Sequence, residues 1–416
     1  MAKIKVLRII ARLNIGGPAI HTTLLTAGLD KNRFSSLLVC GAISKGEGDM
    51  GYYAAQKGVR PIFIPQLRRE LNPFNDLMAL AKIFKIVLRE KPDIIHTHTA
   101  KAGTLGRIAG IIYNLSMRLL CPAFGWARND RWNSTIKLIH TFHGHVFDGY
   151  FNSFANKIFV IIEKILASFT DKIITVSGNV KSELISLGIA EKGKIEVIPL
   201  GFELDNFLEI RPKVTTETLS IGIVGRLVPV KNHYLFLESA NLLRLSLVSE
   251  AEPFKLRFII VGDGELRREL EECAHALNLS EYVEFAGWQK GLPQVYADLD
   301  IVCLTSLNEG TPVSLIEAMA SSKAIVATDV GGVRDLLGEE LESFRALQNG
   351  FNVRHRGVTV KSNDVNAFAR ALKLVLEDKE LRKNLSISGR EYVKNKFTRE
   401  RLVADTEELY LKTLKI

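Results

Sequence analysis

Short apolar segments alternate with longer helix-like segments along most of this 416-residue chain. We expect a first series of buried strands at residues 5–10, 36–42, 59–64, 93–98, 137–142 and 172–176, and a second at residues 219–224, 256–261, 282–285, 301–305 and 324–328. Helical patterns, such as that of residues 75–90, lie between the strands. Strands of a parallel sheet are apolar on both faces because helices cover both. The alternation therefore predicts α/β domains with doubly wound sheets.

We place the boundary between two Rossmann-like domains near Gly201, after a further strand at residues 195–198. This predicts an N-terminal domain at residues 1–200, a C-terminal domain at residues 201–398 and a final helix at residues 399–416. Each domain is long enough to bury its own core. Ligands of such sheets bind beyond the carboxyl ends of the strands, so we expect the two domains to face a central cleft.

Two carboxylates, Glu309 and Glu317, lie eight residues apart across an expected loop-to-helix junction. Gly310 frees the loop backbone, and Pro312 suits the first turn of a helix. The following residues are apolar on nearly every helical face, so Glu317 should be buried and must find partners. An arginine or backbone amides could supply them, and so could the paired hydroxyls of a ribose. Free N–H groups at the helix start would favour an anion such as a diphosphate.

Glycine turns follow several other expected strands. Arg226 and Lys231 follow Gly225, and they offer a planar fork and a point charge for phosphate, although a surface ion pair would also explain them. Tight turns at residues 262–264 and 331–332 either border a nucleotide site or serve only the fold. After the first strand, Gly16 and Gly17 would let the backbone approach a phosphate closely, a weak signal by itself.

Histidines gather at the ends of the fourth and fifth expected strands, and they are His96, His98, His140, His143 and His145. Lys101 follows the first of these groups. Strand ends of one sheet share an edge, so this grouping indicates a functional site. No Asp or Glu nearby completes a metal ligand set, and we expect no bound metal.

Charge is unevenly placed along the chain. Residues 1–200 carry a net charge of +13 and the remainder −4. A basic half suits an anionic surface or ligand, and a solvated basic face with no partner explains it nearly as well.

The four cysteines form no CxxC pair, which favours a reducing cytosol. Residues 1–13 are too short and charged for a signal peptide. Charged residues interrupt the apolar stretch at 151–170, so we expect an amphipathic or buried helix there, not a membrane span.

Taken together, the order and spacing of Gly225-Arg226…Lys231-Asn232, Gly262-Asp263-Gly264, Glu309-x7-Glu317 and Gly331-Gly332 resemble those of the retaining GT-B glycosyltransferases of family 4. The motifs Gly16-Gly17…His21, His96-Thr97-His98 and His143-Gly144-His145 are similar to a branch from bacterial exopolysaccharide and lipopolysaccharide clusters. The resemblance covers nearly the whole chain. It implies transfer of a sugar, with retention, from a nucleotide-diphosphate sugar to a lipid-linked or polysaccharide acceptor. UDP is the commonest nucleotide in the family, GDP-mannose is the runner-up, and no metal or other cofactor is implied.

The resemblance also assigns roles by position. Glu317 resembles the ribose-binding glutamate, Glu309 the one that contacts donor-sugar hydroxyls, and His143 the histidine near the anomeric carbon. The implied catalytic residues are His143, Glu309, Arg226 and Lys231. The implied donor-binding residues are Gly16, Gly17, Gly225, Arg226, Lys231, Gly262, Asp263, Gly310, Thr311, Pro312, Val313 and Glu317. Acceptor-side candidates are His96, His98, Lys101 and His145. The last helix, residues 399–416, would cross back to the first domain.

Two segments depart from the family pattern. Residues 115–136 carry Trp126, Trp132 and several arginines, a mixture that suits either a membrane interface or an extra packed helix. Residues 353–362 form a longer and more basic loop than usual. We expect a cytoplasmic protein, peripheral on the inner face of the membrane, with an anionic surface, a sugar donor and a lipid-linked acceptor as partners and no nucleic acid.

Three rival interpretations remain. A nucleotide-sugar 2-epimerase on the same fold would hydrolyse or invert a donor without an acceptor. A dinucleotide dehydrogenase is disfavoured because no G-x-G-x-x-G follows the first strand. A non-enzymatic protein that docks on membranes would need only the basic half of the chain, and would not need Arg226, Lys231, Glu309 and Glu317 together.

Overall fold

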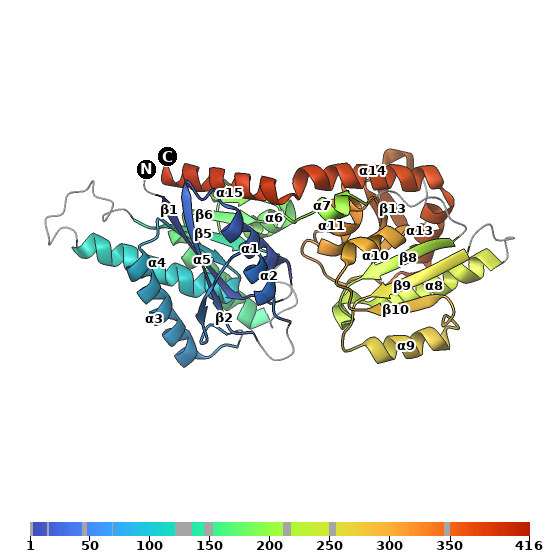
Figure 1. Cartoon of the computed structure of the whole chain (residues 1–416), viewed down its shortest axis with the longest axis horizontal. Coiled ribbons are helices and arrows are strands. Elements are labelled where there is room, and N and C mark those ends of the chain that lie inside the picture. The colour runs from blue at the N-terminus through green and yellow to red at the C-terminus, as the bar shows by residue number, and fades with distance from the viewer. Residues whose placement is uncertain are drawn as a thin grey trace. The chain divides into compact units, whose positions relative to one another are not determined.

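The computed structural model describes residues 3–14, 16–43, 48–68, 70–120, 135–144, 153–210, 218–248, 255–344 and 350–416 (Figure 1). The chain divides into two compact units. The first comprises Met1–Phe202 together with Arg399–Ile416, and the second comprises Glu203–Thr398. Each unit is built around one seven-stranded sheet.

The first sheet has the strand order β3-β2-β1-β4-β5-β6-β7, and every described pairing in it is parallel. Its strands are β1 (Ile4–Arg12), β2 (Phe34–Gly41), β3 (Ile62–Ile64), β4 (Ile94–His98), β5 (Lys137–Phe142), β6 (Lys172–Thr175) and β7 (Ile195–Val197). The chain builds outward from β1 in one direction and from β4 in the other. The switch point of this sheet therefore lies between β1 and β4, where a ligand site is expected.

The helices of the first unit are α1 (Gly17–Gly28), α2 (Gly51–Gln56), α3 (Pro73–Glu90), α4 (Ala100–Leu120), α5 (Ser153–Phe169), α6 (Gly178–Ser186), the short η3 (Lys192–Lys194) and α15 (Arg399–Leu414). Three glycines bring α4 close to the sheet. A Cβ on Gly103 would lie 2.5 Å from His140, and a Cβ on Gly106 or Gly110 would also clash with strand side chains. The spacing of these glycines therefore sets how closely α4 packs on β4 and β5.

The C-terminal helix α15 belongs to the first unit. Leu402, Leu409 and Tyr410 are buried in one cluster with residues of the first sheet, including Val6 and Ile94. Arg401 donates hydrogen bonds to the backbone oxygens of Pro199 and Leu200 in the same unit. The last helix thus completes the core of the N-terminal unit.

The second sheet has the strand order β10-β9-β8-β11-β12-β14-β13. Its strands are β8 (Thr218–Val224), β9 (Lys255–Val261), β10 (Val283–Gly287), β11 (Ile301–Leu304), β12 (Ala324–Thr328), β13 (Phe351–Arg354) and β14 (Gly357–Val360). All described pairs are parallel except β13 with β14, which form an antiparallel hairpin. Residues 353–362 were expected to be a loop, and that expectation is wrong: most of them form this hairpin. Phe351 and Val353 on β13, and Val358 and Val360 on β14, belong to the core cluster, and this alternation within each strand is the signal that was missed.

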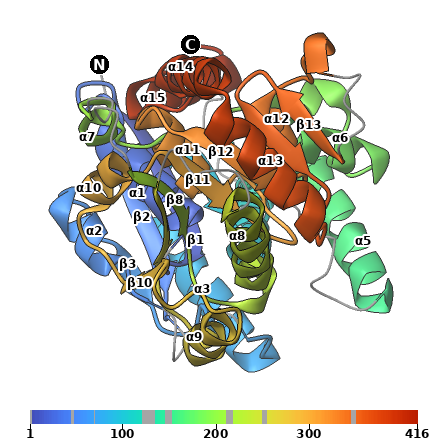
Figure 2. The ribbon, with the colours of Figure 1, turned by 90° about the vertical axis from the view of Figure 1, so that its right-hand side faces the viewer.

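The remaining helices belong to the second unit. They are α7 (Asp205–Leu208), η4 (Pro229–Lys231), α8 (His233–Val248), α9 (Arg267–Ala276), α10 (Leu292–Asp298), α11 (Val313–Ala320), α12 (Val333–Leu337), η5 (Glu342–Phe344), α13 (Val365–Glu377) and α14 (Lys379–Lys396). Helices α8 and α13 pack side by side (Figure 2). Phe236, Phe258 and Phe368 are buried within the largest core cluster of this unit.

Two segments of the first unit that the sequence singled out lie, in their described parts, mostly within helices. The stretch around residues 151–170 is helix α5, and Glu163 within it is buried against Arg107 of α4, whose guanidinium donates to both carboxylate oxygens at 2.8 Å. Helix α4 runs to Leu120, so it includes residues 115–120 of the unusual segment, and residues 121–134 lie outside the described residues. Within the described part of the chain, every helix is too short or too polar to cross a membrane.

Candidate active site

In the second unit, a lysine and a glutamate meet at the switch point of the sheet. Lys231 ends the short helix η4 after β8, and Glu309 lies in the loop after β11, the strand that pairs with β8. Lys231 Nζ lies 2.5 Å from Glu309 Oε1, which also accepts from Ser306 Oγ at 2.7 Å. Both side chains are partly buried, which strengthens the pairing relative to an exposed one. Two predicted catalytic residues, 78 positions apart, are therefore direct neighbours.

Glycines hold the loops around this pair in close backbone contact. Gly262 has a φ of +131°, and a Cβ there would lie 1.9 Å from the backbone oxygen of Gly225. A Cβ on Gly331 would lie 1.7 Å from the backbone oxygen of Glu309. The N–H of Gly332 donates to that same oxygen at 3.2 Å. These glycines therefore position the loops that carry Arg226 and Glu309, whether or not they touch a ligand themselves.

Glu317 lies in helix α11, as expected, and its carboxylate meets a tyrosine rather than an arginine. Tyr296 Oη lies 3.0 Å from Glu317 Oε2 and 3.0 Å from the backbone oxygen of Ser314. Burial raises the pKa of the Glu317 carboxyl to about 7, and the hydrogen bond from Tyr296 partly opposes that rise. The expected burial of this helix is confirmed, because Leu315, Ile316 and Ala318 onward are buried.

The other predicted donor-side residues surround these groups. The Arg226 side chain is exposed, with no ion-pair partner among the described residues. Asp263 accepts from the N–H of Gly264 and lies 3.5 Å from Arg267. Pro312 is the N-cap of α11 rather than part of its first turn, so the helix begins at Val313, after Gly310 and Thr311.

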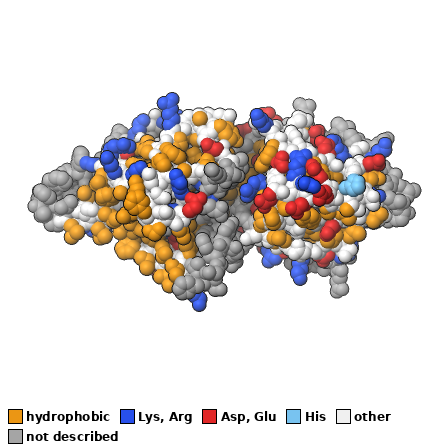
Figure 3. Space-filling view, turned by 90° about the horizontal axis from the view of Figure 1, so that it is seen from below, with side chains coloured by type: hydrophobic (Ala, Val, Ile, Leu, Met, Phe, Trp, Pro, Cys, Tyr) orange, Lys and Arg blue, Asp and Glu red, His pale blue; other side chains and the backbone are white. Residues whose placement is uncertain are grey.

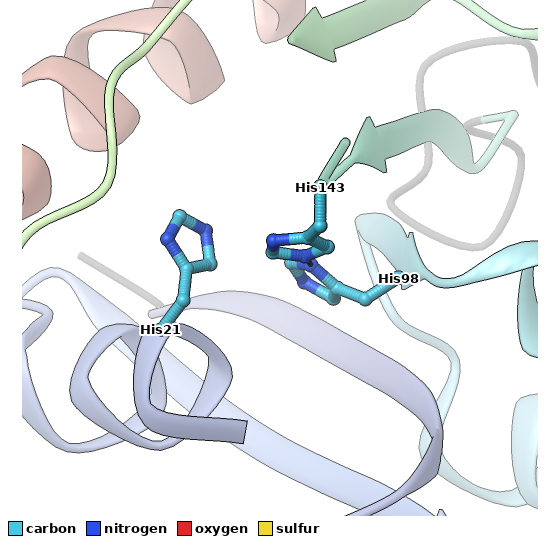
Figure 4. A group of neighbouring side chains, drawn as sticks. All are labelled: His21, His98 and His143. Carbon is cyan, nitrogen blue, oxygen red and sulfur yellow. Dashed lines mark hydrogen bonds between the residues drawn. The ribbon is translucent and has the colours of Figure 1, made fainter. Parts of the chain in front are cut away.

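In the first unit, three histidines converge from three elements (Figure 4). His21 lies on α1, His98 ends β4 and His143 follows β5. His98 Nδ1 lies 3.0 Å from His143 Nε2, and the ring centroids of His21 and His143 are 4.9 Å apart. Burial is the main cause that lowers the pKa of all three, and it lowers that of His143 to about 3, so each ring is neutral near pH 7. The sequence analysis found no metal ligand set, because no Asp or Glu lies near these histidines in sequence. The fold nevertheless brings three imidazole rings together.

A hydrogen-bonded network centred on His96 lies beside the three histidines. The ring centroids of His96 and His98 are 4.2 Å apart, with the planes tilted by 36°. His96 bonds Tyr410 Oη through Nδ1 at 2.6 Å and Thr141 Oγ1 through Nε2 at 2.7 Å. The buried Arg8 donates to the same tyrosine oxygen at 3.0 Å. Arginine can only donate, so the Tyr410 oxygen accepts from Arg8. Its own proton can then be donated to His96 Nδ1, the arrangement in which His96 carries its proton on Nε2. Sequence reasoning missed Arg8 and Tyr410; a charge inside an apolar strand was the available signal for Arg8.

Other predicted residues of the first unit have different surroundings. The Lys101 ammonium lies 2.6 Å from Asp76 and also donates to the backbone oxygen of Glu70. His140 bonds Thr97 and packs on Gly103, so it belongs to the interface between α4 and the sheet. His145 lies outside the described residues. Gly16 caps α1 with a φ of +155°, and Gly17 is the first residue of that helix.

Two doubly wound units with polar loops at the carboxyl ends of their strands define the class of GT-B enzymes. Residues 15–206 match the family described as Glycosyltransferase Family 4, and residues 207–392 match Glycosyl transferases group 1. The chain therefore belongs to the family 4 glycosyltransferases, a retaining family, as the sequence motifs predicted.

Similar proteins agree with this assignment. An Escherichia coli UDP-Gal:alpha-D-GlcNAc-diphosphoundecaprenol alpha-1,3-galactosyltransferase is 27% identical over 92% of this chain and 90% of its own. The Staphylococcus aureus capsular polysaccharide biosynthesis glycosyltransferase CapM is 24% identical over 84% of each chain. The crystal structure of Anabaena HepE in complex with UDP superposes with a TM-score of 0.74 at 17% identity, covering 98% of this chain and 99% of that one. The superposition on HepE shows that this chain has the GT-B fold.

Proposed function

We propose that this enzyme transfers a sugar from a UDP-sugar to a diphosphate-lipid-linked saccharide during synthesis of a surface polysaccharide. The family supports sugar transfer with retention. UDP is supported by its presence in the HepE complex and in the name of the E. coli relative, and that relative's name also states an undecaprenol-diphosphate acceptor. The donor sugar and the linkage formed are not part of the proposal.

The contact between Lys231 and Glu309 carries the proposal. An ammonium has three N–H donors, and the contact with Glu309 Oε1 at 2.5 Å uses one of them. The others can bind a phosphate oxygen while Glu309 turns its second oxygen to the hydroxyls of the transferred sugar. Lys231 and the exposed Arg226 would then stabilise charge on the departing diphosphate, which is the main electrostatic demand of glycosyl transfer. One ion pair can thus align the leaving group and the sugar.

The nucleoside would lie on the remaining polar groups of the second unit. Glu317 would accept hydrogen bonds from the two ribose hydroxyls, partners that would favour its ionised form. The first N–H groups of α11, at Val313, have the orientation that favours a phosphate. Gly225, Gly262, Asp263, Gly310, Thr311 and Pro312 supply the backbone and loop surface around these groups.

The first unit would contribute to the sugar and acceptor side. Gly16 and Gly17 are proposed to contact the diphosphate, and His143 the transferred sugar near its anomeric carbon. His96, His98 and His145 remain candidates for the acceptor. Lys101 and His96 are the least favoured of these candidates, because each would have to exchange existing contacts to bind an acceptor. Lys101 contacts Asp76 and Glu70, and both ring nitrogens of the buried His96 are already hydrogen-bonded.

A lipid-linked acceptor requires access to a membrane surface, and an apolar face of the first unit suits that requirement. Five large apolar side chains of α5 are exposed, namely Ile158, Ile161, Ile162, Ile165 and Phe169. Lys157 and Lys164 are exposed on the same helix. Figure 3, which views the molecule of Figure 1 from below, shows further hydrophobic side chains gathered over this unit. Amphipathic helices with this composition bind at lipid headgroups, and anionic lipids would favour the lysines.

Nucleotide release tests the proposal. Purified enzyme is incubated with UDP-sugars, with and without a polyprenyl-diphosphate-linked saccharide, and free UDP is measured. We expect UDP release that depends on the acceptor, together with a lengthened lipid-linked product. Release or inversion of the donor at the same rate without an acceptor would instead support the 2-epimerase or hydrolase alternative. Glu309→Gln serves as the control, because it should abolish transfer while the protein remains folded.

A further inference from the structure

The three histidines His21, His98 and His143 are placed as ligands of a metal ion would be. Each offers a ring nitrogen, and these atoms all lie within 4.8 Å of one another. Figure 4 shows His98 and His143 with their rings adjacent and His21 approaching from α1. Two nitrogens bound to one tetrahedral zinc are separated by about 3.3 Å, given bonds of about 2.0–2.1 Å. The 3.0 Å between His98 Nδ1 and His143 Nε2 is close to that separation.

His21 and His98 are buried and His143 is partly buried, and the protein satisfies their ring nitrogens only in part. Among the described residues, His21 Nδ1, His98 Nε2 and His143 Nδ1 are buried without a hydrogen-bond partner. When an ion enters, the proton in the hydrogen bond between His98 Nδ1 and His143 Nε2 would move to the other nitrogen of its own ring, so that both facing nitrogens can bind the metal. His21 must move toward the other two rings by a change of side-chain rotamer.

We propose that His21, His98 and His143 form a binding site for a divalent transition-metal ion of the zinc type, with a fourth position open to water. Imidazole nitrogen suits zinc, copper and nickel, whereas magnesium and calcium prefer oxygen ligands. The unpartnered outer ring nitrogens mean that no second set of groups fixes the ligands. Such groups are worth about 10–100-fold in affinity, so this site should bind zinc more weakly than structural zinc sites do.

Occupancy of the site would inhibit sugar transfer. A metal bound to His143 would hold that ring and its lone pair away from the donor sugar, and removal of the metal by a chelator would restore activity. This consequence rests on the proposed role of His143 in transfer. Formation of the metal site itself does not depend on that role.

Cobalt binding tests the site without reference to activity. Chelator-treated protein is titrated with Co²⁺, and the visible absorption of a tetrahedral cobalt complex is followed before Zn²⁺ is added to displace it. We expect one ion per chain and loss of the absorption when Zn²⁺ is added. His21→Gln and His98→Gln should each weaken Zn²⁺ binding at least tenfold in calorimetry, with folding checked by thermal denaturation. His275→Gln, an exposed histidine on α9, is the matched control and should bind as the wild type does.

Each outcome separates the two proposals. No tetrahedral cobalt spectrum, or equal Zn²⁺ affinity in His21→Gln, His98→Gln and wild type, would overturn the metal site and leave the proposed transfer reaction standing. Saturable binding with no effect of Zn²⁺ on UDP release would confirm the site and remove His143 from the transfer mechanism. Inhibition by Zn²⁺ at the concentration that fills the site, reversed by EDTA, would support both.

Discussion

The hydroxyl of Tyr296 lies 3.0 Å from Glu317 Oε2 and equally close to the backbone oxygen of Ser314. One hydroxyl proton cannot serve both acceptors at once. Tyr296 therefore divides its proton between Ser314 and Glu317, and its hydrogen bond to the carboxylate offsets only part of the pKa rise that burial causes. This geometry agrees with the raised pKa of Glu317. Burial therefore favours the neutral carboxyl of Glu317, whereas ribose hydroxyls bonded to it would favour the ionised form.

The first prediction concerns pH and stability. The pKa of Glu317 in the folded chain is about 7 against an ordinary 4.5, so between these values the folded chain holds a proton that the unfolded chain has released. The free energy of unfolding should therefore fall as pH rises through this window, with this residue contributing at most about 1.4 kcal/mol per pH unit. In Glu317→Gln this contribution should vanish. Denaturant unfolding at pH 5 to 8 checks it, and an unchanged pH slope in the variant would count against the raised pKa.

The same residue should make UDP binding depend on pH. If ribose hydroxyls bond the ionised carboxylate, UDP should bind about tenfold more tightly at pH 8 than at pH 6, as the ionised fraction rises about tenfold. In Glu317→Gln, any pH dependence of UDP affinity that remains comes from titration of UDP itself. Calorimetry at both pH values measures the affinities. Parallel pH dependence in wild type and variant would remove Glu317 from the ribose site.

Removing either cation of the β8 loop should weaken nucleotide binding. Arg226→Ala and Lys231→Ala should each cost roughly 1.5–3 kcal/mol in UDP affinity, the size of a lost charge-assisted hydrogen bond, and should lower turnover. Lys231→Ala should also leave Glu309 without its ion-pair partner, so the double variant Lys231→Ala/Glu309→Ala separates the two effects. Arg268→Ala, on the exposed face of α9, is the control. Unchanged UDP affinity in both single variants would reject the phosphate assignment.

Transfer should continue in EDTA. Lys231 and Arg226 are proposed to take the place of a divalent cation at the diphosphate, so chelation should leave UDP release unchanged. If trace zinc occupies the histidine site, EDTA should raise the rate. The assay compares enzyme with and without EDTA at matched ionic strength. Complete loss of transfer that magnesium or manganese restores would contradict the proposed donor site.

Membrane binding should be peripheral and should need the exposed face of α5. Wild-type enzyme should sediment with anionic vesicles and be released by salt, because screening shortens the reach of each lysine. Ile161→Ser/Ile165→Ser should reduce binding, since both side chains are 57% exposed and burying them in lipid would be favourable. The triple change Trp126→Ser/Trp132→Ser/Arg128→Glu tests the segment that lies outside the described residues.

The control for membrane binding is Leu245→Ser, an exposed apolar change on α8 of the second unit. Retention of binding in the α5 variant with loss in the triple variant would move the docking surface to residues 121–134. Equal absence of wild-type enzyme from anionic and neutral vesicles would reject membrane docking altogether.

Much of the fold could be predicted because its signals are local. A buried parallel strand is apolar along its length, and glycine turns mark where strands end, so the expected strands of both sheets were found without knowing their neighbours. The hairpin of β13 and β14 was missed because its strands are short and carry Arg354, whose charge is neutralised by Asp329 only in the folded chain. The buried Glu163 similarly finds Arg107 only through packing of α5 on α4.

For the candidate site, the sequence by itself determined which side chains stand at strand ends, since Lys231, Glu309 and His98 each follow from the order of strands along the chain. Only the tertiary structure decided that Lys231 bonds Glu309, that His21 joins His98 and His143, and that Tyr410 reaches His96 across 314 positions. The reason is physical. Strand periodicity depends on neighbours along the chain, whereas a hydrogen bond between distant residues depends on how two elements pack, which no local pattern records.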